Sequence, residues 1–375
     1  MLQGLEAFGA RFARWVMNSG VRVGSIVEIP LLIDRSWLVI MVLLTTTNAL
    51  TFAPRFGIIP GFLAGFVMAL LLFASVLLHE LGHSVVAQSQ GIKVLSITLF
   101  CFGGVAAIER ESSSPGKTLQ VAIAGPAVSL ILFCIFSTLT PLFPSGSLIH
   151  QLAVNLATIN LALALFNMIP GLPLDGGQVL KAIIWQITGD RIQGFRWAAY
   201  SGKLLGGVAI ATGLTLTITA GQWGGLWMAL IGGFIWRNAN RYGQLTNLQG
   251  ALLKLVAADA MTRDSWDVTA STLRQSISRF LPVAQEHVVQ EQTPLLEVIK
   301  HLERSRLRQI TVLTSAGYVA GVIDRGDVVN AVARQLKVPL SEGQIQQIKL
   351  QGIYPQQLPL VAIAQTIAPI DVQLG

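Results

Sequence analysis

Two long stretches of the chain contain no charged side chain, and this feature limits its possible folds more than any other. No Asp, Glu, Lys or Arg occurs from Val121 to Pro170, and none occurs from Leu204 to Trp236. Each stretch is longer than the ~20 apolar residues that a helix needs to cross a bilayer. With 52% apolar and 12% charged residues, the composition favours a polytopic membrane protein. It excludes a disordered chain, a disulfide-built secreted module and a protein whose main task is binding nucleic acid.

The distribution of charge divides the chain into two parts. From Ala257 to the end, 22 of 119 residues are charged, against seven between Trp37 and Pro170. This contrast predicts a membrane domain followed by a soluble domain of ordinary size. The expected segments are an N-terminal amphipathic or extended segment (1–35), a transmembrane domain (36–240), a linker (241–257), a soluble domain (258–335) and a C-terminal tail (336–375).

Six apolar windows are candidates for membrane spans. Arg and Lys gather in alternate connections between them, which predicts cytoplasmic termini and an even number of spans. The net charge of +7 is explained by this bias and needs no nucleic-acid partner. The first 20 residues predict an amphipathic helix at the membrane surface, with a mobile tail as the alternative. The windows are Trp37–Ala53, Ile59–Ala87, Leu119–Leu142, Leu148–Ile169, Trp197–Ala220 and Trp223–Trp236, of which the last is short enough to be a re-entrant element.

The second window contains the pattern H-E-x-x-H, formed by His79, Glu80 and His83. The two histidines are four residues apart, so on a helix they lie on one face and can bind the same metal ion. Glu80 lies beside them and is a candidate general base. The alternative is a pair of buried histidines next to an unrelated glutamate. Because ionisable groups inside a membrane span are costly and usually functional, the pattern favours a metal site.

Asp175 is the best candidate for a third metal ligand, which catalytic zinc sites normally have. It follows the fourth window in the sequence FNMIPGLPLDGG, where two prolines and three glycines interrupt the helix. Irregular backbone at membrane depth occurs only where it is buried in protein or lines a wet cavity. Both motifs lie at the same predicted side of the membrane, so Asp175 and the histidines can share a depth. The alternative role for Asp175 is to cap the segment that follows.

The two motifs together resemble the site-2 protease family of intramembrane zinc metalloproteases. The resemblance covers residues 20–240 and rests on HELGH and on the N-x-x-P-x-x-P-L-D-G-G arrangement that ends at Gly177. It implies a zinc enzyme whose active site lies within the membrane domain. The implied site residues are His79, His83 and Asp175 as ligands of one Zn²⁺ per chain, Glu80 as the base and Asn167 as a contact to the substrate backbone.

The segment Val94–Glu109 matches the position of a membrane-associated β-hairpin in that family. Its β-branched and aromatic residues, interrupted by Gly103 and Gly104, support extended structure on their own. An exposed hairpin edge can pair with an unwound substrate, so both glycines are candidate substrate contacts. The alternative is a plain loop between two helices.

Residues 258–335 resemble a CBS module, and the whole arrangement resembles the subgroup of the family with a fused C-terminal CBS domain. The pattern predicts a helix followed by two strands and a second helix. The expected elements are a helix over Pro294–Leu307, strands over Gln309–Leu313 and Tyr318–Ile323, and a helix from Gly326.

Asp327 stands where the CBS signature binds an adenosyl ribose, so an adenine nucleotide is a candidate ligand. Asp324 departs from the Thr or Ser that is common in the signature, and only one module is well formed. A CBS-like module that serves in dimerisation or substrate docking without a ligand is therefore the alternative.

The expected fold is a polytopic α-helical membrane protein of about six transmembrane helices with a membrane-associated β-hairpin, plus a C-terminal α/β CBS-like soluble domain. The expected activity is zinc-dependent hydrolysis of a peptide bond in a transmembrane substrate near the cytosolic face, as in regulated intramembrane proteolysis. Expected partners are the lipid bilayer, a membrane-anchored substrate such as a transcription or anti-sigma factor, and a second copy bound through the CBS domain. The expected location is a bacterial-type inner membrane. A CBS-regulated transporter and an inactive protease-like scaffold are the alternatives.

Overall fold

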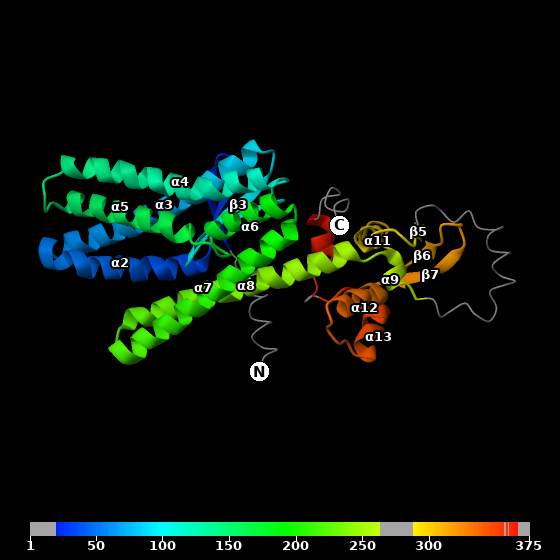
Figure 1. The fold of residues 1–375 in the computed structure, drawn as a ribbon. Helices are drawn as coiled ribbons and strands as arrows, with labels where there is room; N and C mark the ends of the chain where they lie inside the picture. Colours follow the sequence, from blue (N-terminus) through cyan, green and yellow to red (C-terminus); the bar gives the residue numbers. More distant parts are fainter. Residues whose placement is uncertain (1–19, 263–287, 356–357, 359, 367–375) are drawn as a thin grey trace. The chain divides into compact units, whose positions relative to one another are not determined.

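The computed structural model describes residues 20–262, 288–355, 358 and 360–366. The amphipathic helix expected at the N-terminus lies outside these residues, and so do residues 263–287 of the expected CBS-like domain. The chain divides into two compact units, the first ending at Gly243 and the second beginning at Gln244. Figure 1 shows the elements of both units.

The first unit is built mainly from long apolar helices (Figure 1). In the described part of the chain, five helices are long and apolar enough to cross a membrane. They coincide with the first five expected windows, so the prediction of a mostly helical integral membrane protein is confirmed. The sixth window lies at the start of α8 (Trp223–Lys254), which is not among the five. The five are α2 (Arg35–Phe56), α3 (Ile58–Ser89), α4 (Pro115–Leu139, extended by the 3-10 turn η1, Thr140–Leu142), α5 (Leu148–Asn167) and α7 (Arg191–Ala220).

Local sequence signals set the ends of these helices. Asp34 accepts a hydrogen bond from the backbone N–H of Ser36 at 2.8 Å and thereby caps the start of α2. Ser147 caps α5 in the same way, by accepting from the backbone N–H of His150 at 3.2 Å. Gly57 separates α2 from α3 with a φ of 91°, a conformation that residues with a Cβ rarely adopt. The two helices therefore form an antiparallel pair.

Small residues allow the central helix α3 to approach its neighbours closely. A Cβ on Gly61 or Gly65 would lie 2.7 or 2.6 Å from backbone atoms of α2. Such close backbone contact is typical of helix packing in membranes, where water does not drive apolar surfaces together. Apolar side chains such as Ile131 and Leu204 stay exposed on the outer faces, which suits contact with lipid chains.

A four-stranded sheet packs against the end of α3 that carries the histidines. The strand order is β1-β2-β3-β4, with antiparallel pairs at both sides and a parallel pair in the middle. The expected hairpin is present as β3 and β4, whereas β1 and β2 form where the sequence predicted only an extended or amphipathic segment. Ile29, Ile97 and Ala87 share the core between sheet and helix. The strands are β1 (Val21–Ile26), β2 (Ile29–Ile33), β3 (Val94–Phe100) and β4 (Gly103–Ile108).

The broken segment after α5 leads into a short helix, α6 (Asp175–Thr188). The segment is held by α7, because Leu172 donates its N–H to the carbonyl of Ala198 at 3.0 Å. Ser201 donates its hydroxyl to the carbonyl of Pro170. Leu172 is fully buried. These contacts fix the position from which α6 starts.

The second unit contains a three-stranded sheet with helices packed on it. β5 and β6 are parallel, and β6 and β7 are antiparallel. Both expected strands and both expected helices are present at nearly the expected residues. The elements are α9 (Ala257–Ala260), β5 (Val288–Gln290), α11 (Leu295–Arg304), β6 (Gln309–Leu313), β7 (Val319–Asp324) and α12 (Arg325–Gln335).

The flanking segments also belong to the core of this unit. The tail forms α13 (Glu342–Gln351) and α14 (Leu360–Thr366), whose Ile348 and Leu360 are buried. The segment 241–257, expected to be a linker, is helical within α8 as far as Lys254. Its Leu248, Leu252 and Leu255 recur at helical spacing and are buried in the same core, which explains why this segment is ordered.

Candidate metal centre

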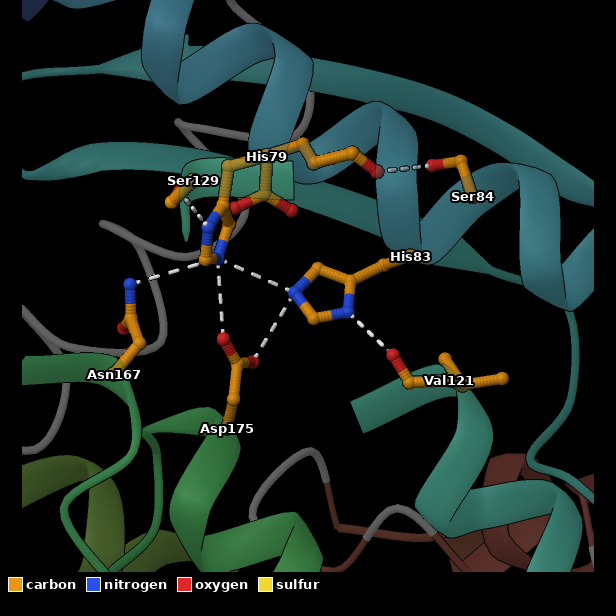
Figure 2. A network of polar contacts seen from close by, with 8 residues as sticks. His79, His83, Ser84, Val121, Ser129, Asn167 and Asp175 are labelled. Carbon is orange, nitrogen blue, oxygen red and sulfur yellow. Dashed lines mark hydrogen bonds and ion pairs between the residues drawn. The ribbon is translucent and has the colours of Figure 1, made fainter. Parts of the chain in front are cut away.

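His79 and His83 lie one turn apart on α3 and are 3% and 8% exposed. Their ring centroids are 5.0 Å apart, and the two Nε2 atoms are separated by 3.3 Å. Figure 2 shows both imidazoles directed toward the same point. The helical spacing of the H-E-x-x-H pattern therefore produces the arrangement that the sequence predicts.

Asp175 is the first residue of α6 and faces both histidines (Figure 2). Its Oδ2 lies 3.1 Å from His79 Nε2, and its Oδ1 lies 3.3 Å from His83 Nε2. Gly176 and Gly177 make this approach possible, since a Cβ on either would overlap the backbone of the preceding loop. The glycines after Asp175 thus let the start of α6 pack tightly enough for the carboxylate to reach α3.

Each histidine is held through its other ring nitrogen. His83 Nδ1 lies 2.7 Å from the carbonyl oxygen of Val121, and His79 Nδ1 lies 2.9 Å from Ser129 Oγ. A carbonyl can only accept, so Nδ1 of His83 carries a proton, and in the neutral imidazole its Nε2 presents a lone pair. Ser129 is fully buried and can hold His79 in the same tautomer. Partners of this kind orient the histidines of metal sites.

The donor atoms at this point fit a zinc ion. One atom from each of His79, His83 and Asp175 lies within 4.8 Å of the others. With both histidines in the neutral Nε2 lone-pair form, three acceptors face one another at 3.1–3.3 Å, an arrangement that suits a metal cation between them. Ligands about 2.0–2.1 Å from a tetrahedral zinc stand about 3.3 Å from one another, so the spacing also matches.

Asn167, the last residue of α5, lies at the edge of the same cluster (Figure 2). Its Nδ2 is 3.5 Å from His79 Nε2, which is at the limit of a hydrogen bond. The side chain therefore stands beside the three acceptors.

Glu80 follows His79 on α3 and is partly buried. The hairpin lies over it, because a Cβ on Gly104 would come within 2.6 Å of Glu80 Cγ. Gly103 has a φ of 133° and no atom within 4 Å of an added Cβ. Of the two hairpin glycines, Gly104 is thus the one that gives the carboxylate room.

Three further positions belong to the site although the sequence did not single them out. They are the carbonyl of Val121, the hydroxyl of Ser129 and the bare Cα of Gly125, where a Cβ would overlap the imidazole of His83. All three lie on α4 in a stretch of uniform apolar composition. Only the packing of α4 against α3 reveals them, and no sequence pattern marks them.

Asp327 lies in the second unit and is 6% exposed. Its Oδ1 accepts from Thr262 Oγ1 at 2.8 Å and from Lys349 Nζ at 2.7 Å. Its Oδ2 accepts from the backbone N–H of Asp324 at 3.1 Å. Both oxygens are therefore engaged by the chain itself, and a role in nucleotide binding stays a prediction.

Comparison with known proteins gives consistent similarities. The family model described as peptidase family M50 matches residues 67–155 and 141–205. A protein of Synechocystis sp. that carries a zinc metalloprotease name is 42% identical over 312 residues, which are 79% of this chain and 81% of that protein. A zinc metalloprotease of Methanocaldococcus jannaschii is 29% identical over 272 residues, which are 72% of this chain and 74% of that protein. The solved structure of the site-2 protease of that organism is 28% identical in sequence. The match covers 60% of this chain and 95% of the solved chain, with a TM-score of 0.44.

Proposed function

Since this chain belongs to peptidase family M50 and is a zinc metalloendopeptidase of the membrane, we propose that it cleaves transmembrane substrates near the cytosolic face of the bilayer. The observation that carries the proposal is the convergence of three acceptor atoms, from His79, His83 and Asp175, inside a unit built from apolar helices. A site that holds a catalytic metal among membrane-length helices is suited to substrates that are themselves embedded in the membrane.

The three converging residues are the proposed zinc ligands, held by Val121 and Ser129. Zinc bound there would supply Lewis acidity toward a peptide carbonyl and a water acidic enough to ionise near neutral pH. The chain's contribution is to fix both imidazoles with their Nε2 atoms directed inward and to bring the carboxylate of Asp175 against them.

Glu80 is the proposed general base and acid. It would take a proton from the attacking water and deliver it to the leaving amine. The hairpin beside it, at Gly104, would hold the substrate close to this carboxylate.

The substrate must be extended before it can react, because the carbonyls of a transmembrane helix are engaged in its own hydrogen bonds. We propose that the edge strand β4 pairs with the unwound segment and that Asn167 binds its backbone near the scissile bond. Gly103 and Gly104 open the start of this strand to the substrate. Pairing with β4 would offset part of the free energy needed to unwind the substrate helix.

The second unit is the proposed regulatory part, with a CBS-like module over residues 258–335. Its strand and helix order supports this assignment, whereas an adenine nucleotide at Asp327 and association of two copies remain proposals. We further propose an inner-membrane location with both termini cytoplasmic, and a membrane-anchored regulatory protein as substrate. Neither the transporter nor the inactive scaffold is favoured by an observation in the described residues.

The test of this function is to replace Glu80 by Ala and to use Glu109→Ala as the control, since Glu109 is exposed at the end of the hairpin. Glu80→Ala should bind zinc at the wild-type ratio and lose cleavage of a membrane-embedded substrate by at least about 100-fold. Glu109→Ala should retain both properties. Undiminished cleavage by purified Glu80→Ala, free of other proteases, would exclude the proposed mechanism.

A further inference from the structure

A cluster of three charged side chains lies outside the metal centre. Glu111 Oε2 is 3.2 Å from Lys181 Nζ and 2.7 Å from Arg191 Nη2. Glu111 and Arg191 are partly exposed, but the side chain of Lys181 is only 2% exposed. A buried ammonium group needs a compensating partner, because transferring a charge from water into protein is costly.

Lys181 is enclosed on several sides. Its Nζ lies 4.2 Å from the centroid of the Phe195 ring, close enough for a cation–π contact. Its backbone carbonyl faces α7, where a Cβ on Gly194 would come within 2.5 Å of the oxygen. Lys181 therefore fixes the middle of α6 through its side chain and through its backbone.

The three charged residues belong to segments that each support the catalytic centre. Glu111 lies in the connection between β4 and α4, just after the strand that covers Glu80. Lys181 lies on α6, which begins with Asp175. Arg191 is the first residue of α7, whose Ala198 holds the loop before α6. The cluster thus joins the helix that presents Asp175 to the segment that follows the hairpin.

We propose that Lys181 is a positioning residue for Asp175. Its ion pair with Glu111 holds α6 at mid-length, while Gly176 and Gly177 hold the start of the helix against the loop. With both points fixed, the Asp175 carboxylate stays within reach of His79 and His83 on α3. This inference rests on the metal site proposed above.

The test is to measure zinc affinity in the full-length protein by competition with a chelator. Lys181→Met keeps most of the length of the side chain but removes its charge, and should weaken zinc binding about 10-fold, the lower end of the effect seen for residues that support metal ligands. Lys181→Arg keeps the charge and should weaken it less. The visible absorption of Co²⁺ bound in place of zinc should change in Lys181→Met, because the geometry of the Asp175 ligand changes.

Glu111→Gln provides a second variant at a partly exposed position, where misfolding is less of a concern, and should weaken zinc binding in the same direction. Arg325→Met is the matched control, because it breaks a partly buried ion pair with Glu303 of 2.8 Å in the second unit and should leave zinc affinity unchanged. Wild-type zinc affinity and an unchanged Co²⁺ spectrum in folded Lys181→Met and Glu111→Gln would overturn the inference. Equal losses of zinc affinity in Lys181→Met and Lys181→Arg would overturn it as well.

Asp175→Ala separates this inference from the proposed function. If Asp175→Ala loses zinc affinity while Lys181→Met does not, only the positioning role is wrong. If Asp175→Ala also keeps wild-type affinity, the ligand set itself is wrong.

Discussion

Gly125 shows how much the metal centre depends on a residue that contributes no functional group. It lies on α4 opposite His83, at a position where a side chain would occupy the space of the imidazole. Helix interiors disfavour glycine relative to alanine by roughly 0.5–1 kcal/mol, so its presence here has a cost that the fit of His83 explains.

Gly125→Ala should therefore displace His83 and reduce the zinc content of the purified protein to a small fraction of one ion per chain. Gly116→Ala is the matched control on the same helix, since a Cβ there meets nothing within 4 Å. Metal analysis of both variants checks this. Full zinc occupancy in Gly125→Ala would show that the site can rearrange around the added methyl group.

Ser129 acts on the same centre through His79. Ser129→Ala removes the partner of Nδ1 and should weaken zinc binding about 10-fold, because the imidazole is no longer held in the correct tautomer and orientation. Ser75→Ala serves as the control, since Ser75 is also buried, on α3, but accepts its hydrogen bond from Asn160 at 3.0 Å. Chelator competition measures both, and equal affinities in the two variants would contradict the role of Ser129.

At the scale of elements, the connection between β4 and α4 is held by the ion pairs that Glu111 forms with Lys181 and Arg191. Partial burial alone would raise the pKa of Glu111, but Lys181 and Arg191 outweigh this effect and hold the pKa below its usual range. A carboxyl group with a lowered pKa in the folded state stabilises that state when ionised. The contribution is complete above the unfolded pKa of about 4.3 and is lost as the pH falls through the folded value.

Because the pKa of Glu111 is lowered in the folded state, its contribution to stability should depend on pH. In zinc-free protein, the melting temperature of wild type should exceed that of Glu111→Gln at neutral pH, and the difference should shrink as the pH falls below about 4.3. Thermal unfolding in detergent from neutral to acidic pH measures it. Zinc-free samples separate the effect from loss of the metal. A difference that is independent of pH would show that Glu111 contributes through packing and not through charge.

The helices were largely predictable from the sequence, but half of the sheet was not. A membrane span is a local property of about 20 residues, so each of the first five windows could be located from its own composition. β1 and β2 gain their stability because β2 pairs with β3, a strand from which two long helices separate them in the sequence. No local pattern in residues 21–33 carries that information.

The candidate site divides in the same way. His79, Glu80 and His83 are recognisable because their spacing matches one helical turn, and Asp175 because it follows a broken helix. Ser129 and Gly125 take their roles from the packing of α4 on α3, and Ser129 lies 50 positions after its partner His79 in the sequence. Such roles are fixed by tertiary contacts, which a single sequence does not display.

At the scale of the whole molecule, each unit has its own core. Leu302 is fully buried in the core of the second unit, which contains no residue of the metal centre. Leu302→Ala should lower the free energy of unfolding of this unit by about 2–5 kcal/mol, because it leaves a cavity among packed side chains. Zinc affinity should stay at the wild-type value.

Hydrogen exchange of the backbone amides of β6 measures the free energy of unfolding of the second unit, and chelator competition measures the zinc affinity. Leu350→Ala is the control, since Leu350 is 82% exposed and should alter neither quantity. Loss of zinc in Leu302→Ala would show that the folding of the two units is coupled.

The parallel pairing of β2 with β3 also has a consequence for how the chain is made. β1 and β2 are synthesised before β3, and this partner strand emerges only after α2 and α3 are complete. At synthesis rates of about 5–20 residues per second, the two strands wait on the order of several seconds. An isolated two-stranded hairpin is marginally stable, and its free edge can pair with other chains. The nascent protein therefore passes through an interval in which this edge is open to mispairing, and the interval ends when β3 has been synthesised and pairs with β2.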